Sequence, residues 1–253
     1  MTLSELDGYF RDIFEIDAMA RVDSSTNGIQ VSRREPQVKR VAFAVDACLE
    51  TIMRASEMGA DVLVVHHGFF WGRVEPITDV LYERIRHLME ADLALYAIHL
   101  PLDRHEELGN NAGMAAALGL GNVKPFGQYK GFEIGCRGTL AEPASTQDIV
   151  RRLFGDTNSV IEMLPFGPDK NEHIALISGG APYEVRQALD VGADLYITGD
   201  ASHNIYHHCV EAGINVIFGG HYQTETWGVR LLSERLARDS ALETFFIDVP
   251  TGL

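Results

Sequence analysis

Residues 59–68 read Gly-Ala-Asp-Val-Leu-Val-Val-His-His-Gly, and this stretch decides how the chain folds. The apolar run at 62–65 predicts a buried strand, and His66 and His67 stand at its carboxyl end. Sites in open α/β sheets are built at the carboxyl ends of strands. Neighbouring strand residues point to opposite faces, so the pair suits two centres, or one centre where the backbone turns. A histidine pair in a surface loop is the alternative interpretation.

Strands and helices are expected to alternate around this stretch, after an amphipathic helix at 3–14. This alternation is typical of βαβ units with a mostly parallel sheet. The predicted order is strand 38–45, helix 49–58, strand 62–65, helix 79–90 and strand 93–98.

The same order recurs in the second half of the chain, and this indicates an internal duplication. Gly192-Ala193-Asp194 precedes its second strand as Gly59-Ala60-Asp61 precedes the strand at 62–65, in a register without gaps. Any two βαβ units look partly alike, but the shared tripeptide favours duplication. The predicted elements are strands at 174–178, 195–198 and 214–218, with helices at 183–191 and 201–211.

We therefore predict an α/β fold of two related domains with mixed, mostly parallel sheets. Residues 1–124 form the first domain and residues 125–253 the second, with 125–129 as the boundary. The strand-like run at 244–249 can join either sheet, and so can pack back on the first domain.

Six candidate ligands stand at predicted strand ends. The third strand of the first half ends at His99, four residues before Asp103, and its counterpart ends at His221, four residues before Glu225. Imidazole and carboxylate bind zinc, iron, manganese, nickel or cobalt. Together with His66 and His67, these groups exceed the needs of one ion and fit a pair of ions between the halves. Unrelated core or surface histidines are the alternative.

The composition limits the class of protein and its partners. With 46% hydrophobic and 23% charged residues, the 253-residue chain is typical of a globular protein. Its net charge of −15 opposes direct binding to nucleic acid. No apolar run approaches the length of a membrane span, and no signal peptide is recognisable at the N-terminus. The three cysteines form no CxxC pair, so we expect a reducing, cytoplasmic location.

Five motifs, in this order along the chain, resemble one family, the dinuclear-metal-centre proteins called type 2 GTP cyclohydrolase I homologues or NGG-interacting-factor-3-like proteins. The match runs nearly end to end and is of the short form. Ile29 stands where the family often has Leu. The motifs are Asn27-Gly28-Ile29-Gln30, His66-His67-Gly68-Phe69-Phe70-Trp71, His99-Leu100-Pro101-Leu102-Asp103 with Gly109-Asn110-Asn111, Thr198-Gly199-Asp200, and Gly220-His221-Tyr222-Gln223-Thr224-Glu225.

The resemblance implies a ring-shaped homohexamer with two divalent metal ions in each subunit. It implies that the ligands are His66, His67, Asp103, His221 and Glu225, with Glu225 bridging. His99 also matches, as a pocket residue, although the internal repeat makes it a ligand candidate. We expect His99 and His105 to lie behind the ligands or to face the substrate.

Three functions are compatible with these residues. The first is a metal-dependent hydrolase, in which activated water attacks a nucleotide or related small molecule; no P-loop motif is present to hold phosphates. The second is a non-enzymatic protein that stores, senses or delivers metal ions. The third, a DNA-associated regulator, is opposed by the net charge. Catalytic residues other than the ligands, the metal and the substrate are not identified by the sequence.

Overall fold

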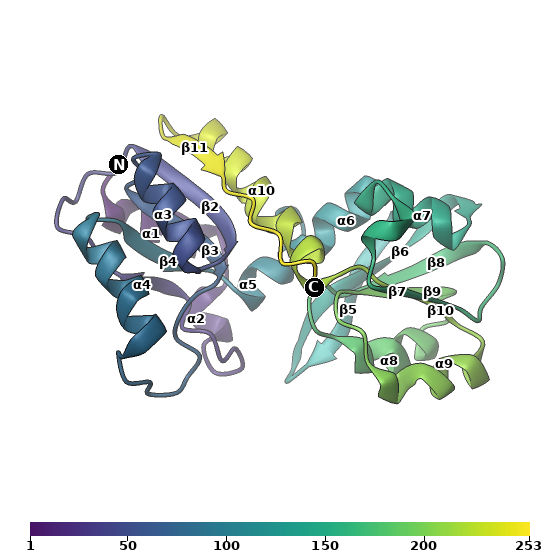
Figure 1. Cartoon of the computed structure of the whole chain (residues 1–253). Coiled ribbons are helices and arrows are strands. Elements are labelled where there is room, and N and C mark those ends of the chain that lie inside the picture. The colour runs from purple at the N-terminus through teal and green to yellow at the C-terminus, as the bar shows by residue number, and fades with distance from the viewer. The chain divides into compact units, whose positions relative to one another are not determined.

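The structure is a computed structural model that describes residues 1–253. It divides into two compact units, each built on a β-sheet of its own (Figure 1). The first unit comprises residues 1–102 and 229–249, and the second comprises residues 103–228 and 250–253. The predicted α/β class with two mixed sheets is confirmed.

The sheet of the first unit has the strand order β1-β4-β3-β2-β11. Strands β11, β2, β3 and β4 run parallel, and β1 pairs antiparallel with β4 at the edge. The C-terminal strand β11 thus belongs to the first sheet. The strands are β1 (Gly28–Val31), β2 (Arg40–Asp46), β3 (Val62–His67), β4 (Ala94–Ala97) and β11 (Glu243–Phe246).

Helices cover both faces of this first sheet (Figure 1). On one face, Ile52 of α3 and Leu88 of α4 pack with Leu63 and Leu95 of the strands. On the other, Phe10 of α1 contacts Tyr96, with ring centroids 4.9 Å apart. Because both faces are covered, the central strands are apolar throughout. The helices are α1 (Leu3–Ile13), α2 (Ile16–Met19), α3 (Leu49–Glu57) and α4 (Asp79–Glu90).

The sheet of the second unit has the order β5-β6-β8-β9-β10-β7. Only β8, β9 and β10 are parallel, and this trio corresponds to the predicted second βαβ series. The segment 125–129, predicted as a boundary, forms part of edge strand β5, where a proline is tolerated. The strands are β5 (Gly121–Tyr129), β6 (Phe132–Ala144), β7 (Glu162–Pro165), β8 (Asn171–Leu176), β9 (Leu195–Thr198) and β10 (Asn215–Phe218).

Helices α6 and α7 pack on one face of the second sheet, and α8 and α9 lie on the other (Figure 1). The buried core under α6 and α7 includes Met114, Ile149 and Leu176. None of the helices combines the length and hydrophobicity that crossing a membrane requires. The remaining helices are α5 (Leu100–Asp103), α6 (Asn110–Leu118), α7 (Thr146–Phe154), α8 (Val185–Asp190), α9 (Tyr206–Ala212) and α10 (His221–Asp239), with short 3₁₀ turns η1 (Thr157–Ser159), η2 (Pro182–Glu184) and η3 (His203–Ile205).

The repeated Gly-Ala-Asp tripeptide makes the same turn in both units. Oδ2 of Asp61 accepts hydrogen bonds from the backbone N–H groups of Lys39 and Arg40, at 2.7 and 2.9 Å. Oδ2 of Asp194 accepts from residues 172 and 173, at 2.9 and 2.8 Å. The two glycines, at 59 and 192, both have φ +70°, which a side chain would strain. The tripeptide therefore ties each helix–strand turn to the start of the neighbouring strand.

Candidate metal-binding residues

The two histidines at the end of β3 are held by the strands on either side of it. Nδ1 of His66 lies 2.9 Å from the carbonyl oxygen of Ile98, just beyond β4. Nδ1 of His67 lies 2.8 Å from Oδ1 of Asp46, the last residue of β2. Each ring therefore has one nitrogen fixed by a neighbour at the same edge of the sheet.

The glycine after the histidine pair is required by close packing. A Cβ atom at Gly68 would collide with the side-chain amide of Gln30. That amide accepts a hydrogen bond from the backbone N–H of Phe69 at 2.6 Å and donates to the carbonyl oxygen of Thr26 at 2.7 Å. Gln30 and Gly68, which belong to two separate motifs, are thus in contact with each other next to the histidine pair.

His99 lies beyond the end of β4 and is fixed by a buried carboxylate. Its Nδ1 lies 2.8 Å from Oδ1 of Asp23, whose side chain has no exposed surface. Burial disfavours the charged carboxylate, yet the contact with His99 and the hydrogen bonds from Asn27 and Ser25 lower the pKa of Asp23. The Asn27 amide also accepts a hydrogen bond from the backbone N–H of His99, at 2.7 Å. This network explains the asparagine of the Asn-Gly motif.

The three imidazoles of the first unit converge. The ring centroid of His66 lies 4.7 Å from that of His67 and 4.9 Å from that of His99. One potential ligand atom of each residue lies within 4.8 Å of the other two. The indole of Trp71 meets His99 edge to face, with centroids 4.9 Å apart, and so closes one side of the cluster.

In the second unit, Asp103 is oriented by two donors. Its Oδ1 accepts hydrogen bonds from Oγ of Ser178 and from the amide of Asn110, both at 2.8 Å. Asn111 follows in the same motif, and its amide donates to the backbone carbonyl of Asp103 at 3.1 Å. Potential ligand oxygens of Asp103 and Glu225 lie within 4.8 Å of each other.

His221 and Glu225 lie one turn apart at the start of α10. Nε2 of His221 is 3.2 Å from Oε1 of Glu225, and its Nδ1 is 3.0 Å from Oδ1 of Asp200. Burial opposes protonation, but Glu225 and Asp200 outweigh it and raise the pKa of His221 to about 9. Gly179 makes room for this pair, since a Cβ there would collide with Oε1 of Glu225.

The donor chemistry fits divalent transition-metal ions. In all four histidines, Nδ1 faces an oxygen acceptor, either a carbonyl or a carboxylate. A histidine that donates from Nδ1 presents the unprotonated Nε2, which is the ligand form, and metal-binding histidines are commonly held in this way. The imidazole–carboxylate contact at 3.2 Å also favours a shared cation, whether a proton or a metal ion.

The structure brings the predicted residues together within each unit. His66, His67 and His99 cluster in the first unit, and Asp103, His221 and Glu225 gather in the second. His105 forms hydrogen bonds within its own turn, where its Nδ1 accepts from the backbone N–H groups of Glu107 and Leu108.

Sequence reasoning missed the residues that orient the histidines: Asp23, Asp46 and Asp200. Signals existed for Asp200 alone, which stands in the Thr198-Gly199-Asp200 motif and occupies the place in the second half that His67 occupies in the first.

The fold and the donors define a class: an α/β protein of two units that carries histidine and carboxylate side chains at its strand ends. The model of the Duf34/NIF3 (NGG1p interacting factor 3) family matches residues 1–252, and the chain belongs to this family. The resemblance found in the motifs is thereby confirmed.

Relatives and solved structures agree with this assignment. The chain is 41% identical to a protein of Treponema pallidum named GTP cyclohydrolase 1 type 2 homolog, with all of both chains covered. Among solved structures, a protein described as ybgI, of unknown function, is 31% identical with a TM-score of 0.92. The protein TTHA1606 from Thermus thermophilus is 36% identical with a TM-score of 0.90. Both matches cover the whole of each chain.

Proposed function

We propose that this protein is a metal-dependent hydrolase with a centre for two divalent ions. The proposed ligands are His66 and His67 from the first unit and Asp103, His221 and Glu225 from the second. One observation carries the proposal: each of these three histidines has its Nδ1 held by an oxygen atom. This arrangement prepares Nε2 for a metal ion.

The ions would supply Lewis acidity, which lowers the pKa of water and polarises an electrophilic substrate atom. The residues of the chain supply the positioning. Ser178 and Asn110 fix the Asp103 carboxylate, while Asp46 and Asp200 fix His67 and His221. His99, held by Asp23 beside Trp71, is proposed to face the substrate.

The name of the Treponema relative suggests nucleotides as the substrate class. The test is a metabolite screen with the metal-loaded protein, with GTP among the compounds and mass spectrometry as the readout. We expect consumption of a nucleotide or related small molecule, and loss of that activity in His67→Ala and Glu225→Gln. His87→Gln is the matched control, since His87 bonds only within α4, to the carbonyl of Glu83, and with its neighbour Arg86. Turnover that survives both ligand substitutions would overturn the proposal.

A non-enzymatic role in metal storage or delivery gives a different result in the same experiment. No compound would be consumed, and the bound metal would pass to an apo-protein or chelator. Tight metal binding together with turnover would exclude that alternative.

We further propose that the protein assembles as a toroidal homohexamer in the cytoplasm. Exposed apolar side chains support self-association, among them Val74, Ile77 and Val80, which are 102%, 52% and 64% exposed. The three cysteines are unpaired, as expected in a reducing compartment. Light scattering should give six times the 28.0 kDa subunit mass, and a monomer would contradict the assembly.

A further inference from the structure

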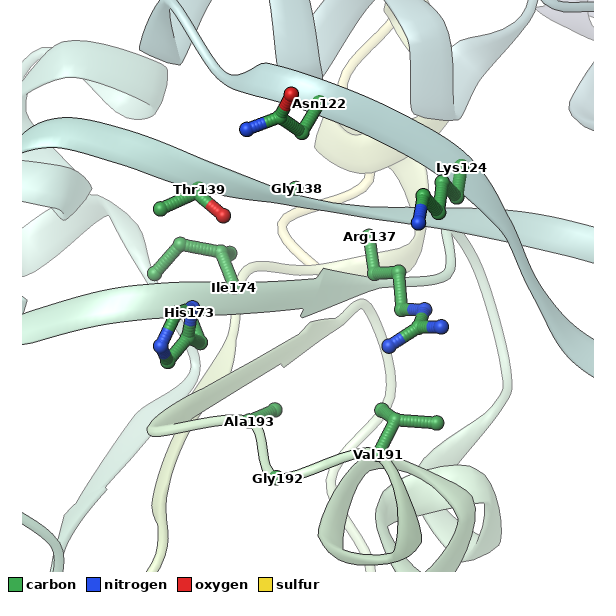
Figure 2. A pocket seen from close by; sticks show the side chains of 10 residues that line it. All are labelled: Asn122, Lys124, Arg137, Gly138, Thr139, His173, Ile174, Val191, Gly192 and Ala193. Atoms are coloured by element: carbon green, nitrogen blue, oxygen red, sulfur yellow. The ribbon is translucent and has the colours of Figure 1, made fainter.

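A basic cavity of about 300 Å³ lies on the second sheet, on the face that carries α8 (Figure 2). Lys124 projects from β5, Arg137 from β6 and His173 from β8, while the loop at 191–193 forms the opposite wall. All of the lining residues belong to the second unit, and none is a proposed metal ligand.

The basic side chains of this cavity are not paired with acids. Neither Lys124, Arg137 nor His173 has a carboxylate within ion-pair distance. The nearby carboxylate of Asp194 forms no ion pair with them; it accepts hydrogen bonds from the backbone N–H groups of Glu172 and His173. Lys124 and Arg137 thus place two unpaired positive charges at one cavity in a chain whose net charge is −15.

The strand register adds an energetic argument. Lys124 and Arg137 are direct cross-strand partners in the antiparallel β5–β6 pair. Like charges in that position destabilise a sheet. Natural proteins keep such an unfavourable pair of like charges mainly where a binding site needs both charges.

An irregularity in β5 lies at the rim of the same cavity. The register of β5 shifts between Gly121 and Lys124, and Asn122 has φ +51° in this segment. Bulges of this kind redirect side chains next to functional sites. Asn122 in this segment and Thr139 of β6 add neutral hydrogen-bonding groups to the cavity.

We propose that this cavity binds a small organic phosphate. The guanidinium of Arg137 suits a phosphoryl group because it can donate two parallel hydrogen bonds, and Lys124 adds a second charge. Val191 and Ala193 supply apolar surface for the carbon part of the ligand. A volume near 300 Å³ is at the lower end of the range for ligand sites, which favours a small molecule.

Calorimetric titration of the 253-residue chain in EDTA tests the proposal, since phosphate then has no metal ion to bind. Ribose 5-phosphate is the probe, and inorganic phosphate at equal ionic strength is the comparison. We expect Lys124→Gln/Arg137→Gln to weaken binding of ribose 5-phosphate by about tenfold or more. Arg152→Gln/Lys170→Gln removes the same charge from exposed positions outside the cavity and should leave the affinity unchanged.

The proposal would be overturned by no binding of ribose 5-phosphate by the unaltered protein, by equal weakening in both double variants, or by equal affinity for ribose 5-phosphate and inorganic phosphate. Thermal unfolding gives an independent readout. Without ligand, the Lys124→Gln/Arg137→Gln variant should melt at the same or a higher temperature, because it relieves like-charge repulsion. A lower melting temperature would mean that Lys124 and Arg137 stabilise the fold, and this result would also overturn the proposal. None of these outcomes depends on hydrolase activity.

Discussion

At the scale of single residues, the groups behind the histidines decide which nitrogen is available. Oδ1 of Asp46 lies 2.8 Å from Nδ1 of His67, and Oδ1 of Asp200 lies 3.0 Å from Nδ1 of His221. Loss of such a supporting carboxylate commonly weakens metal binding by about 10–100-fold, because the imidazole is no longer held as a ligand and becomes less basic.

We therefore expect Asp46→Asn and Asp200→Asn each to weaken metal affinity by about 10–100-fold without unfolding the protein. Competition with a chromophoric chelator measures the affinity, and far-UV circular dichroism checks the fold. Asp169→Asn, at an exposed position, is the matched control. An unchanged affinity in both supporting variants would contradict this role.

The cysteines should differ in reactivity, because thiolate formation depends on burial. Burial raises the pKa of Cys136 to about 12 and also raises the pKa of Cys209, whereas Cys48 is partly exposed. We expect iodoacetamide at pH 8 to label Cys48 in the folded protein, and the other two only after denaturation. Peptide mass spectrometry reads this out, and rapid native labelling of Cys136 would disagree with its burial.

At the scale of elements, Asp61 and Asp194 should each stabilise the turn before its strand, and Asp61 also pairs with Arg33 at 2.6 Å. Each carboxylate accepts two backbone N–H groups, and hydrogen bonds to charged groups contribute about 1.5–3 kcal/mol each. Both side chains are partly exposed, which reduces this contribution. We expect Asp61→Asn and Asp194→Asn each to lower the free energy of unfolding by about 1–3 kcal/mol in urea titrations. A large effect of Asp61→Asn with none of Asp194→Asn would assign the stabilisation to the Arg33 ion pair and contradict a role for the turn.

The Asp61 turn also predicts a pH dependence. Burial opposes the charged carboxylate, but the N–H groups of Lys39 and Arg40 and the charge of Arg33 lower its pKa. A carboxylate with a lowered folded-state pKa stabilises the protein above its unfolded value of about 3.9, and this contribution disappears as the pH falls through the folded pKa. The stability difference between the unaltered protein and Asp61→Asn should therefore be full at pH 6 and shrink below pH 4. A difference independent of pH would contradict this account.

The elements that the sequence predicts best are those with local signals. The helix expected at 79–90 is α4, with the same bounds. The two short edge strands were harder. The sequence predicted no strand for β1, and left the sheet of β11 undecided. The pairing of an edge strand depends on backbone that is far away in the sequence. A short run of residues therefore does not show which strand it will pair with.

The same distinction applies to the candidate site. His66, His67, His99 and His221 were found because apolar strands end at them. Their carboxylate partners lie far away in the sequence: Asp23 is 76 residues from His99, and Asp46 and Asp200 are each 21 residues from their histidines. Contacts at such separations follow from the fold, and a single sequence without a structure cannot reveal them.

At the scale of the whole molecule, the proposed centre draws its donors from both units. A metal ion that binds only the folded protein stabilises it, by about 2.7 kcal/mol at 100 times the dissociation constant. Metal-loaded protein should therefore melt at a higher temperature than protein in EDTA. If the two units share one centre, His67→Ala and Glu225→Gln should each remove most of that gain.

A double-mutant cycle distinguishes a shared centre from two separate ones. In a shared centre, the second substitution costs little after the first, so the two losses of metal-dependent stability are strongly non-additive. Independent sites in the two units would give additive losses. Differential scanning calorimetry with and without saturating metal measures all four proteins, and His87→Gln, added to each background, should change neither result. Additive losses would place separate metal sites on the two units and contradict the shared centre on which the proposed hydrolase depends.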